Sequence, residues 1–469
     1  DSAGEKLSLS RQTAARGGLC WIGKSCLWPN KRNGRNIPGE SEESSEVAAM
    51  DLSEYIAVVT AQMRCKRARA MVAKELADHI ADQKQAYVET GMDEASAELA
   101  AVRQMGDAVE VGREMDRIHR PRMDVKVLAL VGIFSPAACF LQNMLVMAQG
   151  NGEWTLRGAA FTALPVLLGV VLMTGILFVD YTWLCRRPLT VWIVFLLAAM
   201  LPVERIAGRE GGAELIQYLL LALFLPAYGG VIYHYRKKRL PGLLLCLAWL
   251  AAGALVFLFC TGRFFSVMTM GLAGILLLSF CVAKGWFEIS PFSGFGTLLL
   301  TAGGGVCAFA WYILKQGNTY QAARLEALWN GGWESSYIVE GIRQILQNLQ
   351  IVGGKDMFFP WEGALAFLLL LERFGIVAAA FAVAGLAVMF VQMASGVKKQ
   401  KNVFGGILGA ACLLGLFLPT VLHILCNLGL IPYSEAVIPF LFPGWTANAV
   451  CYTLLGLYLS VYRNTDVAA

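Results

Sequence analysis

Ten apolar runs follow one another between Val125 and Arg463, and they constrain the fold more than any other feature of the sequence. A helix of about 20 residues spans the ~30 Å of hydrocarbon in a bilayer. The runs cover residues 125–147, 158–179, 189–203, 213–233, 241–260, 264–283, 296–314, 364–393, 404–426 and 440–461. The sequence therefore predicts an all-α, polytopic membrane protein with about ten transmembrane helices.

The composition excludes an ordinary soluble enzyme. Hydrophobic residues make up 57% of the 469 residues and charged residues only 16%, against about 25% charged in an average soluble protein. The net charge of +5 is too small to indicate a nucleic-acid partner. Most of the twelve cysteines lie inside apolar runs, where cysteine behaves as a small hydrophobe, and no cysteine or histidine spacing predicts a metal site.

The first 49 residues are polar and rich in Gly, Ser and Arg, without apolar periodicity or the apolar core of a signal peptide. Met50 then opens an orderly amphipathic stretch. We expect residues 1–49 to be disordered, or to lie upstream of the true start of the protein.

Residues 50–122 have the pattern of a small soluble bundle of helices at the amino terminus. Apolar residues recur at helical spacing, Gly91 ends the second predicted helix, and Asp93 and Asp107 stand where they can cap the third and fourth. Residues 123–469 form the predicted transmembrane domain, with one large outer loop over 315–361.

Lysine and arginine residues set the expected orientation, because they gather in cytoplasmic loops. They flank the apolar runs at Arg117, Arg120, Arg122, Lys126, Arg186, Arg187, Arg236, Lys237, Lys238, Arg239, Lys284, Lys398, Lys399 and Lys401. Ten spans with both termini in the cytoplasm satisfy this placement. The sequence thus predicts a multi-pass protein of the bacterial plasma membrane.

The stretch ELADHIADQKQAYVETGMDEASAELAAVRQMGDAVEVGREMDRIHRP, residues 75–121, resembles the permease prefix domain. That module precedes several unrelated membrane proteins of Gram-positive bacteria. The resemblance implies a cytosolic helical module and no particular chemistry.

The carboxy-terminal stretch GLIPYSEAVIPFLFPGWTANAVCYTLLGLYLSVYR resembles the end of the SEDS proteins FtsW, RodA and SpoVE. Upstream, LLLLERFGIVAAAF and TYQAARLEALWN resemble other segments of that family, in the same order and at similar spacing. Residues in register with the family pattern include the structural positions Gly375, Pro432, Pro439 and Gly444. Ten spans and one large loop between spans seven and eight are also that family's architecture.

The SEDS resemblance implies a function in synthesis of the cell wall during division, elongation or sporulation. Proteins of this family polymerise glycan strands from lipid II, the undecaprenyl-linked peptidoglycan precursor, beside a class B penicillin-binding protein. The resemblance therefore implies lipid II, that partner and membrane lipids as ligands, and a divalent cation as a possible cofactor.

The family's catalytic aspartate in the outer loop has no exact counterpart here. The segment GGWESS is shorter than the family segment, and Glu334 is its only carboxylate. Glycosyl transfer needs a base for the acceptor hydroxyl or a cation for the leaving group. Glu334 is thus the candidate catalytic residue, and an ordinary solvated loop glutamate is the alternative.

Three residues are candidates for substrate binding. Gln217 is the polar residue retained in IQYLLLAL, where leucines replace the family's Ser, Glu and Lys. Arg263 stands in GRFFS where the family has an Asp, and either faces a lipid phosphate or extends to the interface. Glu372 precedes Arg373 in an apolar run and either binds substrate or has a structural role.

Two further groups of residues have a structural and a functional interpretation. His423 and Asn427 lie one helical turn apart and suit interhelical hydrogen bonds, or a polar pore or metal. Gly303, Gly304 and Gly305 favour close helix packing over phosphate binding.

The sequence leaves three functions open. The first is a SEDS-like glycan polymerase, and the second is a non-catalytic membrane scaffold of the wall-synthesis or division machinery. A permease is the weaker third, because no P-loop and no inverted repeat is present.

Overall fold

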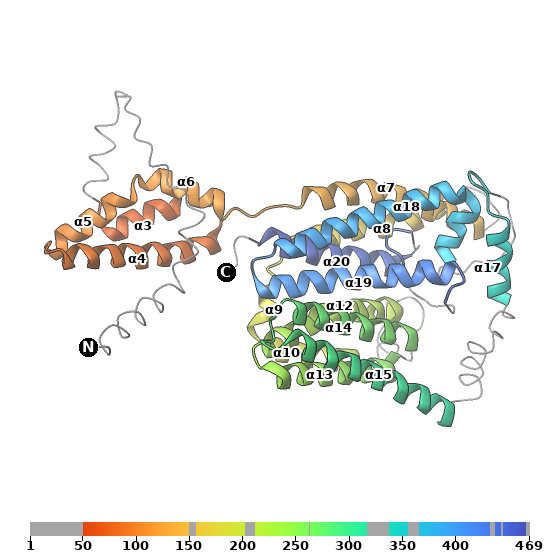
Figure 1. Ribbon diagram of the computed structural model, residues 1–469. Coiled ribbons are helices and arrows are strands. Elements are labelled where there is room, and N and C mark those ends of the chain that lie inside the picture. The colour runs from red at the N-terminus through yellow and green to blue at the C-terminus, as the bar shows by residue number, and fades with distance from the viewer. Residues whose placement is uncertain are drawn as a thin grey trace. The chain divides into compact units, whose positions relative to one another are not determined.

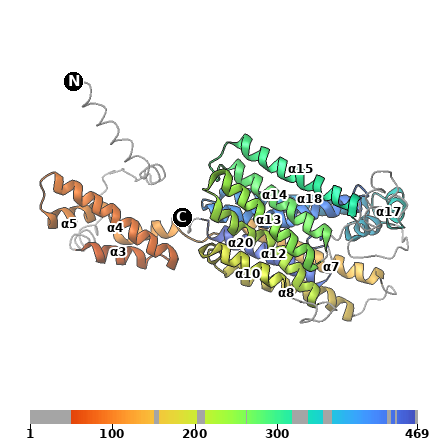
Figure 2. The ribbon, with the colours of Figure 1, turned by 90° about the horizontal axis from the view of Figure 1, so that it is seen from below.

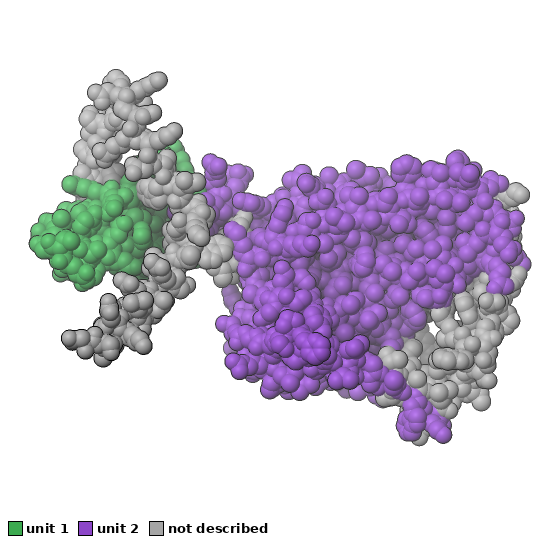
Figure 3. Space-filling model, in the orientation of Figure 1, with its two compact units in different colours: residues 1–63, 71–114 green, residues 64–70, 115–469 purple. Residues whose placement is uncertain are grey.

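The computed structural model describes residues 50–149, 156–201, 212–261, 263–316, 337–354, 365–431, 437–441 and 444–465. Within these residues the regular structure is helical and no strand occurs, so the prediction of an all-α chain is confirmed for them. The chain divides into two compact units (Figure 3), one of residues up to 63 with 71–114 and the other of 64–70 with 115–469. The predicted disorder of 1–49 lies outside the described residues.

Four helices make up the amino-terminal part: α3 (Leu52–Ala61), α4 (Lys66–Glu89), α5 (Glu94–Met105) and α6 (Ala108–Ile118). Aspartates begin three of them. Asp51 accepts a hydrogen bond from the Glu54 amide at 2.7 Å, Asp93 one from Ser96 and Asp107 one from Glu110. The predicted caps at Asp93 and Asp107 are confirmed. Bonds from backbone amides favour the charged carboxylate and lower the pKa of Asp51 and of Asp93.

This amino-terminal unit has its own small apolar core. Tyr55 and Val59 of α3 are fully buried, and so are Ala97 and Ala101 of α5. The Tyr55 hydroxyl donates to the Gly106 carbonyl at 3.1 Å, at the end of α5. Burial and the charge of nearby Asp107 disfavour the phenolate and raise the pKa of Tyr55 to about 12.

The second unit contains the apolar helices, and each predicted span falls on one of them. They are α7 (Val125–Gln149), α8 (Leu156–Phe178), α10 (Pro188–Ala199), α12 (Gly212–Tyr235), α13 (Arg239–Thr261), α14 (Phe264–Ala283), α15 (Pro291–Gln316), α18 (Ala366–Lys399), α19 (Val403–Asn427) and α20 (Trp445–Arg463). A search of the described residues finds six helices long and apolar enough to cross a membrane: α7, α12, α13, α14, α18 and α19. The full count of ten spans stays a prediction.

These helices pack in two groups (Figures 1 and 2). One group holds α7, α8, α18, α19 and α20, and the other holds α10, α12, α13, α14 and α15. Contacts of α12 and α14 with α19, and of α12 with α20, join the two groups. The central helices are consequently the most enclosed, and 61% of the spanning windows of α12 and of α19 is buried.

Glycines allow α8 and α20 to approach each other closely. A Cβ atom on Gly169 of α8 would overlap the ring of Tyr452 on α20. A Cβ on Gly456 of α20 would lie 2.8 Å from the Met173 carbonyl oxygen of α8. Small residues on facing helices let the backbones come together in this way within a membrane.

Helix α18 is broken at Gly375, where φ is 84° and ψ is −179°. The segment 350–353 lies against this break and supplies backbone partners: Gly353 donates to Phe374, and Ile376 donates to Gln350 at 3.0 Å. These bonds satisfy groups that the break removes from the helix. The half of α18 before Gly375 is buried on all its faces.

Two boundaries differ from those predicted. The last span was expected to begin at residue 440, whereas α20 begins at Trp445. Phe440 and Gly444 have positive φ values of 66° and 110°, which a right-handed helix does not contain. Helix α18 extends to Lys399, six residues beyond the predicted end, because the apolar run ends later than expected.

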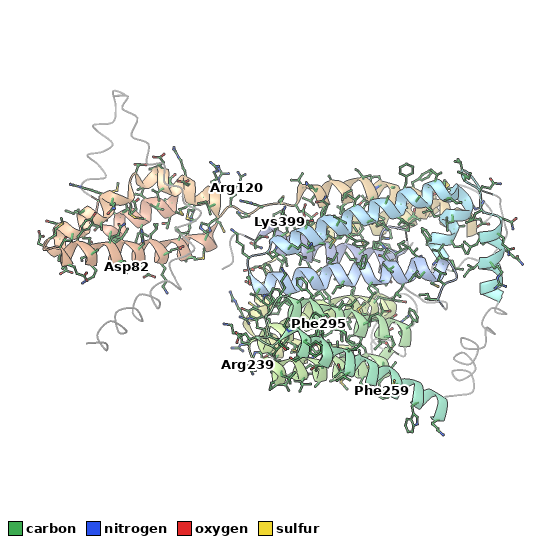
Figure 4. All side chains as sticks on the ribbon, in the orientation of Figure 1. Asp82, Arg120, Arg239, Phe259, Phe295 and Lys399 are labelled. Carbon is green, nitrogen blue, oxygen red and sulfur yellow. The ribbon has the colours of Figure 1, made fainter. Side chains whose placement is uncertain are left out.

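Basic residues gather at one end of the second unit. Arg239 follows α12, and Lys399 ends α18 at the same end (Figure 4). Several of these cations lie over aromatic rings, as Arg236 does at 3.7 Å from the Tyr233 ring centroid. Helix α17 (Tyr337–Gln347) lies at the opposite end (Figure 1).

Candidate functional site

The candidate residues that the structure describes lie at the end of the helices where α17 packs. Gln217 and Arg263 stand near the beginnings of α12 and α14, and Glu372 lies seven residues into α18. Pro439 and Gly444 precede α20. Glu334 and Pro432, two of the residues singled out from the sequence, lie outside the described residues.

Arg263 is held on the ring of Tyr218. Its Nη1 donates to the Tyr218 hydroxyl oxygen at 2.7 Å, and its Cζ lies 4.4 Å from the centroid of that ring. The two residues come from the first turn of α14 and the first turns of α12. A guanidinium stacked on an aromatic face is fixed in direction and keeps further donors for an anion.

An apolar cavity of about 60 Å³ opens beside this pair. Tyr218 is part of its wall, together with Thr269 of α14, Pro419 of α19, Pro439 and Cys451 of α20. The volume holds a few water molecules, so a lipid chain would enter only after the surrounding helices move apart. The cavity nonetheless joins both helix groups at one place, with a cation at its edge.

Gln217 does not take part in this arrangement. It is half-buried on α12, one residue before Tyr218, and does not line the cavity. Neighbouring positions on a helix point about 100° apart, so Tyr218 and Gln217 face different neighbours. The structure therefore brings Arg263 to the cavity through Tyr218, which the sequence did not single out.

Glu372 lies in the buried half of α18, and only 5% of its surface is exposed. It stands three residues before the break at Gly375 and does not line the cavity. A Cβ atom on Gly354 would collide with its carbonyl, so the segment that follows 350–353 passes directly against it. This close approach supports a structural role for Glu372 at the break.

His423 and Asn427 are both fully buried on α19. The Asn427 Oδ1 accepts a hydrogen bond from the Leu368 amide of α18 at 2.9 Å, and its Nδ2 donates to the His423 carbonyl. Leu368 belongs to the first turn of α18, whose amides have no partner within the helix. The interpretation as interhelical hydrogen bonding is confirmed for Asn427.

The structure also shows a buried polar group that the sequence analysis missed. Gln142 of α7 donates to the Phe440 carbonyl at 2.9 Å and lies within hydrogen-bond distance of Asn448 on α20. Asn448 in turn donates to the Gly444 carbonyl. Amides inside apolar runs were the available signal, because such groups are expensive in hydrocarbon and require partners.

The expected close packing at the triple glycine is not observed. A Cβ added to Gly303, Gly304 or Gly305 of α15 would have no atom within 4 Å. This part of α15 faces open space, because α15 packs chiefly against α14.

The described residues do not fit a divalent cation. No group of three or more His, Cys, Asp or Glu residues lies close enough within the described ranges to hold a metal ion. Two or more carboxylates are the usual ligands of such a cation.

No protein-family model and no curated protein matches the sequence. Solved structures do match. A chain from the structure of a peptidoglycan synthase complex that coordinates polymerization and crosslinking shares 15% identity, with a TM-score of 0.58, over 73% of this chain and 98% of that one. A mutant of the rod shape-determining protein RodA from Thermus thermophilus matches over the same shares at 13% identity, with a TM-score of 0.47.

The match to the peptidoglycan synthase complex defines the fold. It spans nearly the whole of that chain and leaves about a quarter of this one outside. The protein is accordingly an integral membrane protein whose apolar helices have the fold of a chain in that complex.

Proposed function

We propose that the protein is a SEDS-like peptidoglycan polymerase, which extends glycan strands from lipid II. The observation that carries this proposal is Arg263, fixed on Tyr218 at the edge of an apolar cavity. A lipid-linked sugar diphosphate has the complementary chemistry, with an apolar chain beside a doubly anionic group. The fold shared with the peptidoglycan synthase complex supports the same class of substrate.

Two roles follow for residues of this chain. Arg263 binds the diphosphate and stabilises the negative charge that grows on it as the bond from the sugar carbon to the diphosphate oxygen breaks. Glu334 takes the proton of the acceptor hydroxyl, whose oxygen forms the new bond to that carbon. The lipid diphosphate leaves with the electron pair of the broken bond. We assign no step to a metal ion, because the described residues do not fit one.

The remaining features of the proposal concern surroundings. The protein spans the bacterial plasma membrane ten times with both termini in the cytoplasm, and works beside a class B penicillin-binding protein. Residues 50–122 are a permease-prefix-like domain. The complex that shares its fold combines polymerization with crosslinking, which supports a crosslinking partner.

The test is synthesis of glycan strands by the purified protein from lipid II, with a penicillin-binding partner supplied. Arg263→Gln is expected to lower kcat/KM at least about tenfold, since a charged hydrogen bond to phosphate contributes ~1.5–3 kcal/mol. Glu334→Gln is expected to abolish polymer. Arg236→Gln is the matched control, because Arg236 also lies on a tyrosine ring but at the other end of α12.

A non-catalytic scaffold is the second candidate. Leu219, Leu220 and Leu223 on α12 replace polar family residues, and the cavity holds only a few waters. A wild-type protein that binds the partner and yields no polymer would establish the scaffold. Equal activity of the wild type and Glu334→Gln would remove Glu334 from the mechanism.

A further inference from the structure

A second, larger hollow lies between α14 and α15, away from the cavity beside Arg263. This groove has a volume of about 710 Å³, within the range of sites that hold a small ligand. Its walls are Ile275 and Ser279 of α14 and the first three turns of α15, including Phe292, Phe295 and Leu299. Phe295 is labelled in Figure 4. The groove is thus confined to the half of α15 next to the loop 284–290.

The groove exists because α15 meets α14 closely at one point and then leaves open space. A Cβ on Gly294 would lie 2.6 Å from the Val282 side chain, which marks the close contact. A Cβ on Gly296, two residues later, would have no atom within 4 Å. Phe292 is 93% exposed and Leu299 is 75% exposed. Side chains of this kind face lipid in a membrane-spanning protein.

The wall chemistry selects a hydrocarbon chain. Ser279 is the polar residue of the groove, and its hydroxyl already donates to the Ile275 carbonyl at 2.9 Å. No wall group among the described residues therefore calls for water, and an apolar hollow at the depth of the bilayer fills with acyl chain.

A cation stands where the head group of such a lipid would lie. Lys284 is the residue after α14, five positions beyond Ser279, and its Nζ lies 5.8 Å from the Phe280 ring centroid. Trp286 packs edge-on against Phe280, with ring centroids 5.6 Å apart, as expected of an interfacial aromatic. Glu288 is the acid of this loop, and it forms no ion pair with Lys284 in the structure as described.

We propose that the α14–α15 groove is a binding site for one anionic phospholipid of the bilayer. An acyl chain lies along Phe292, Phe295 and Leu299, and the phosphate meets Lys284 and the tryptophan beside it. Basic residues between helices at the basic end of a membrane protein bind acidic head groups in this way. The site is separate from the proposed substrate site and does not depend on the proposed function.

The test is native mass spectrometry of the full chain from nanodiscs of equal phosphatidylglycerol and phosphatidylcholine. The wild type is expected to retain one phosphatidylglycerol in preference to phosphatidylcholine by about fivefold, the factor expected for one basic residue. Lys284→Gln is expected to abolish the preference. Gly296→Leu, whose side chain enters the open groove, is expected to abolish retention of either lipid.

Two controls keep the test specific. Gly305→Leu places the same side chain in open space nine residues along α15, on its opposite face, and Lys399→Gln removes a cation at the same end but outside the groove. Both are expected to behave as the wild type. A photoactivatable acyl chain on phosphatidylglycerol should label peptides over 275–302 of the unmutated protein. Equal retention of the two lipids, no effect of Gly296→Leu, or labelling elsewhere would each overturn the proposal.

Discussion

At the scale of single residues, the glycines of the SEDS-like motifs have a physical explanation. Gly375, Gly429 and Gly444 all have positive φ, between 68° and 110°. L-residues with a side chain reach such values only at a cost. The sequence motif marked Gly375 and Gly444 as structural positions, and the structure shows the backbone reason. Their positive φ could not be read from the sequence, because distant segments set it.

Gly375→Ala is expected to destabilise the protein by about 1–3 kcal/mol. The added Cβ would meet the carbonyl oxygens of Ile351, Gln350 and Gly353 at 2.8–2.9 Å, besides the unfavourable φ. The melting temperature in detergent measures the effect. Gly271→Ala on α14 is the control, since its Cβ meets no atom within 4 Å and alanine favours the helix. A melting temperature unchanged by Gly375→Ala would show that the break tolerates a side chain.

At the scale of elements, apolar length predicted the helices well and their interruptions poorly. Each predicted span falls on a helix because hydrocarbon demands internally bonded backbone. The break in α18 escaped prediction because its partners, residues 350–353, lie more than 20 positions away in sequence. Tyr218 was missed for a similar reason. Only the fold brings it to Arg263, and no local pattern distinguishes it from a membrane-facing tyrosine.

Gly456→Leu is expected to separate α8 from α20 and to destabilise the protein by about 1–3 kcal/mol through overpacking. The close contact with the Met173 carbonyl leaves no room for a side chain. Gly175→Leu on α8 is the matched control, because that glycine is exposed and has no atom within 4 Å of its added Cβ. Thermal unfolding in lipid nanodiscs compares the two. Similar losses for both variants would mean that leucine is unfavourable for reasons other than this contact.

The amino-terminal helices are expected to fold alone and to melt cooperatively as a fragment of residues 50–120, since their caps and core are their own. The lowered pKa of Asp51 and Asp93 adds stability that is present above the ordinary value of 3.8 and lost as pH falls through the lowered pKa. The raised pKa of Tyr55 adds stability that is present below 10 and lost as pH rises towards about 12.

Circular dichroism melts of this fragment across pH should therefore give a plateau that falls on both sides. Asp93→Ala is expected to reduce the fall in acid, and Tyr55→Phe the fall in alkali. A fragment without helical signal or cooperative melting would contradict the separate domain.

At the scale of the whole molecule, the placement of charge predicts orientation. Basic residues end helices at one end of the apolar helices, and α17 lies at the other. A cysteine in place of Ser335 is expected to react with a membrane-impermeant maleimide from outside intact cells, whereas one in place of Ser96 is not. The background must lack the exposed Cys260 and Cys307. The reverse labelling pattern would invert the topology.

The break in α18 has a mechanical consequence. The buried half of that helix is covalently joined to the other half at a single swivel, and its direction is set by the backbone of 350–353 at that joint. A pull on the segment between α17 and that joint would therefore tilt the buried half as a lever while residues 376–399 stay in place. Glu372 and Arg373 lie within one helical turn of the fulcrum, and Leu368 at the far arm is tied to Asn427 of α19. Force applied outside the membrane would reach the interior through this one joint.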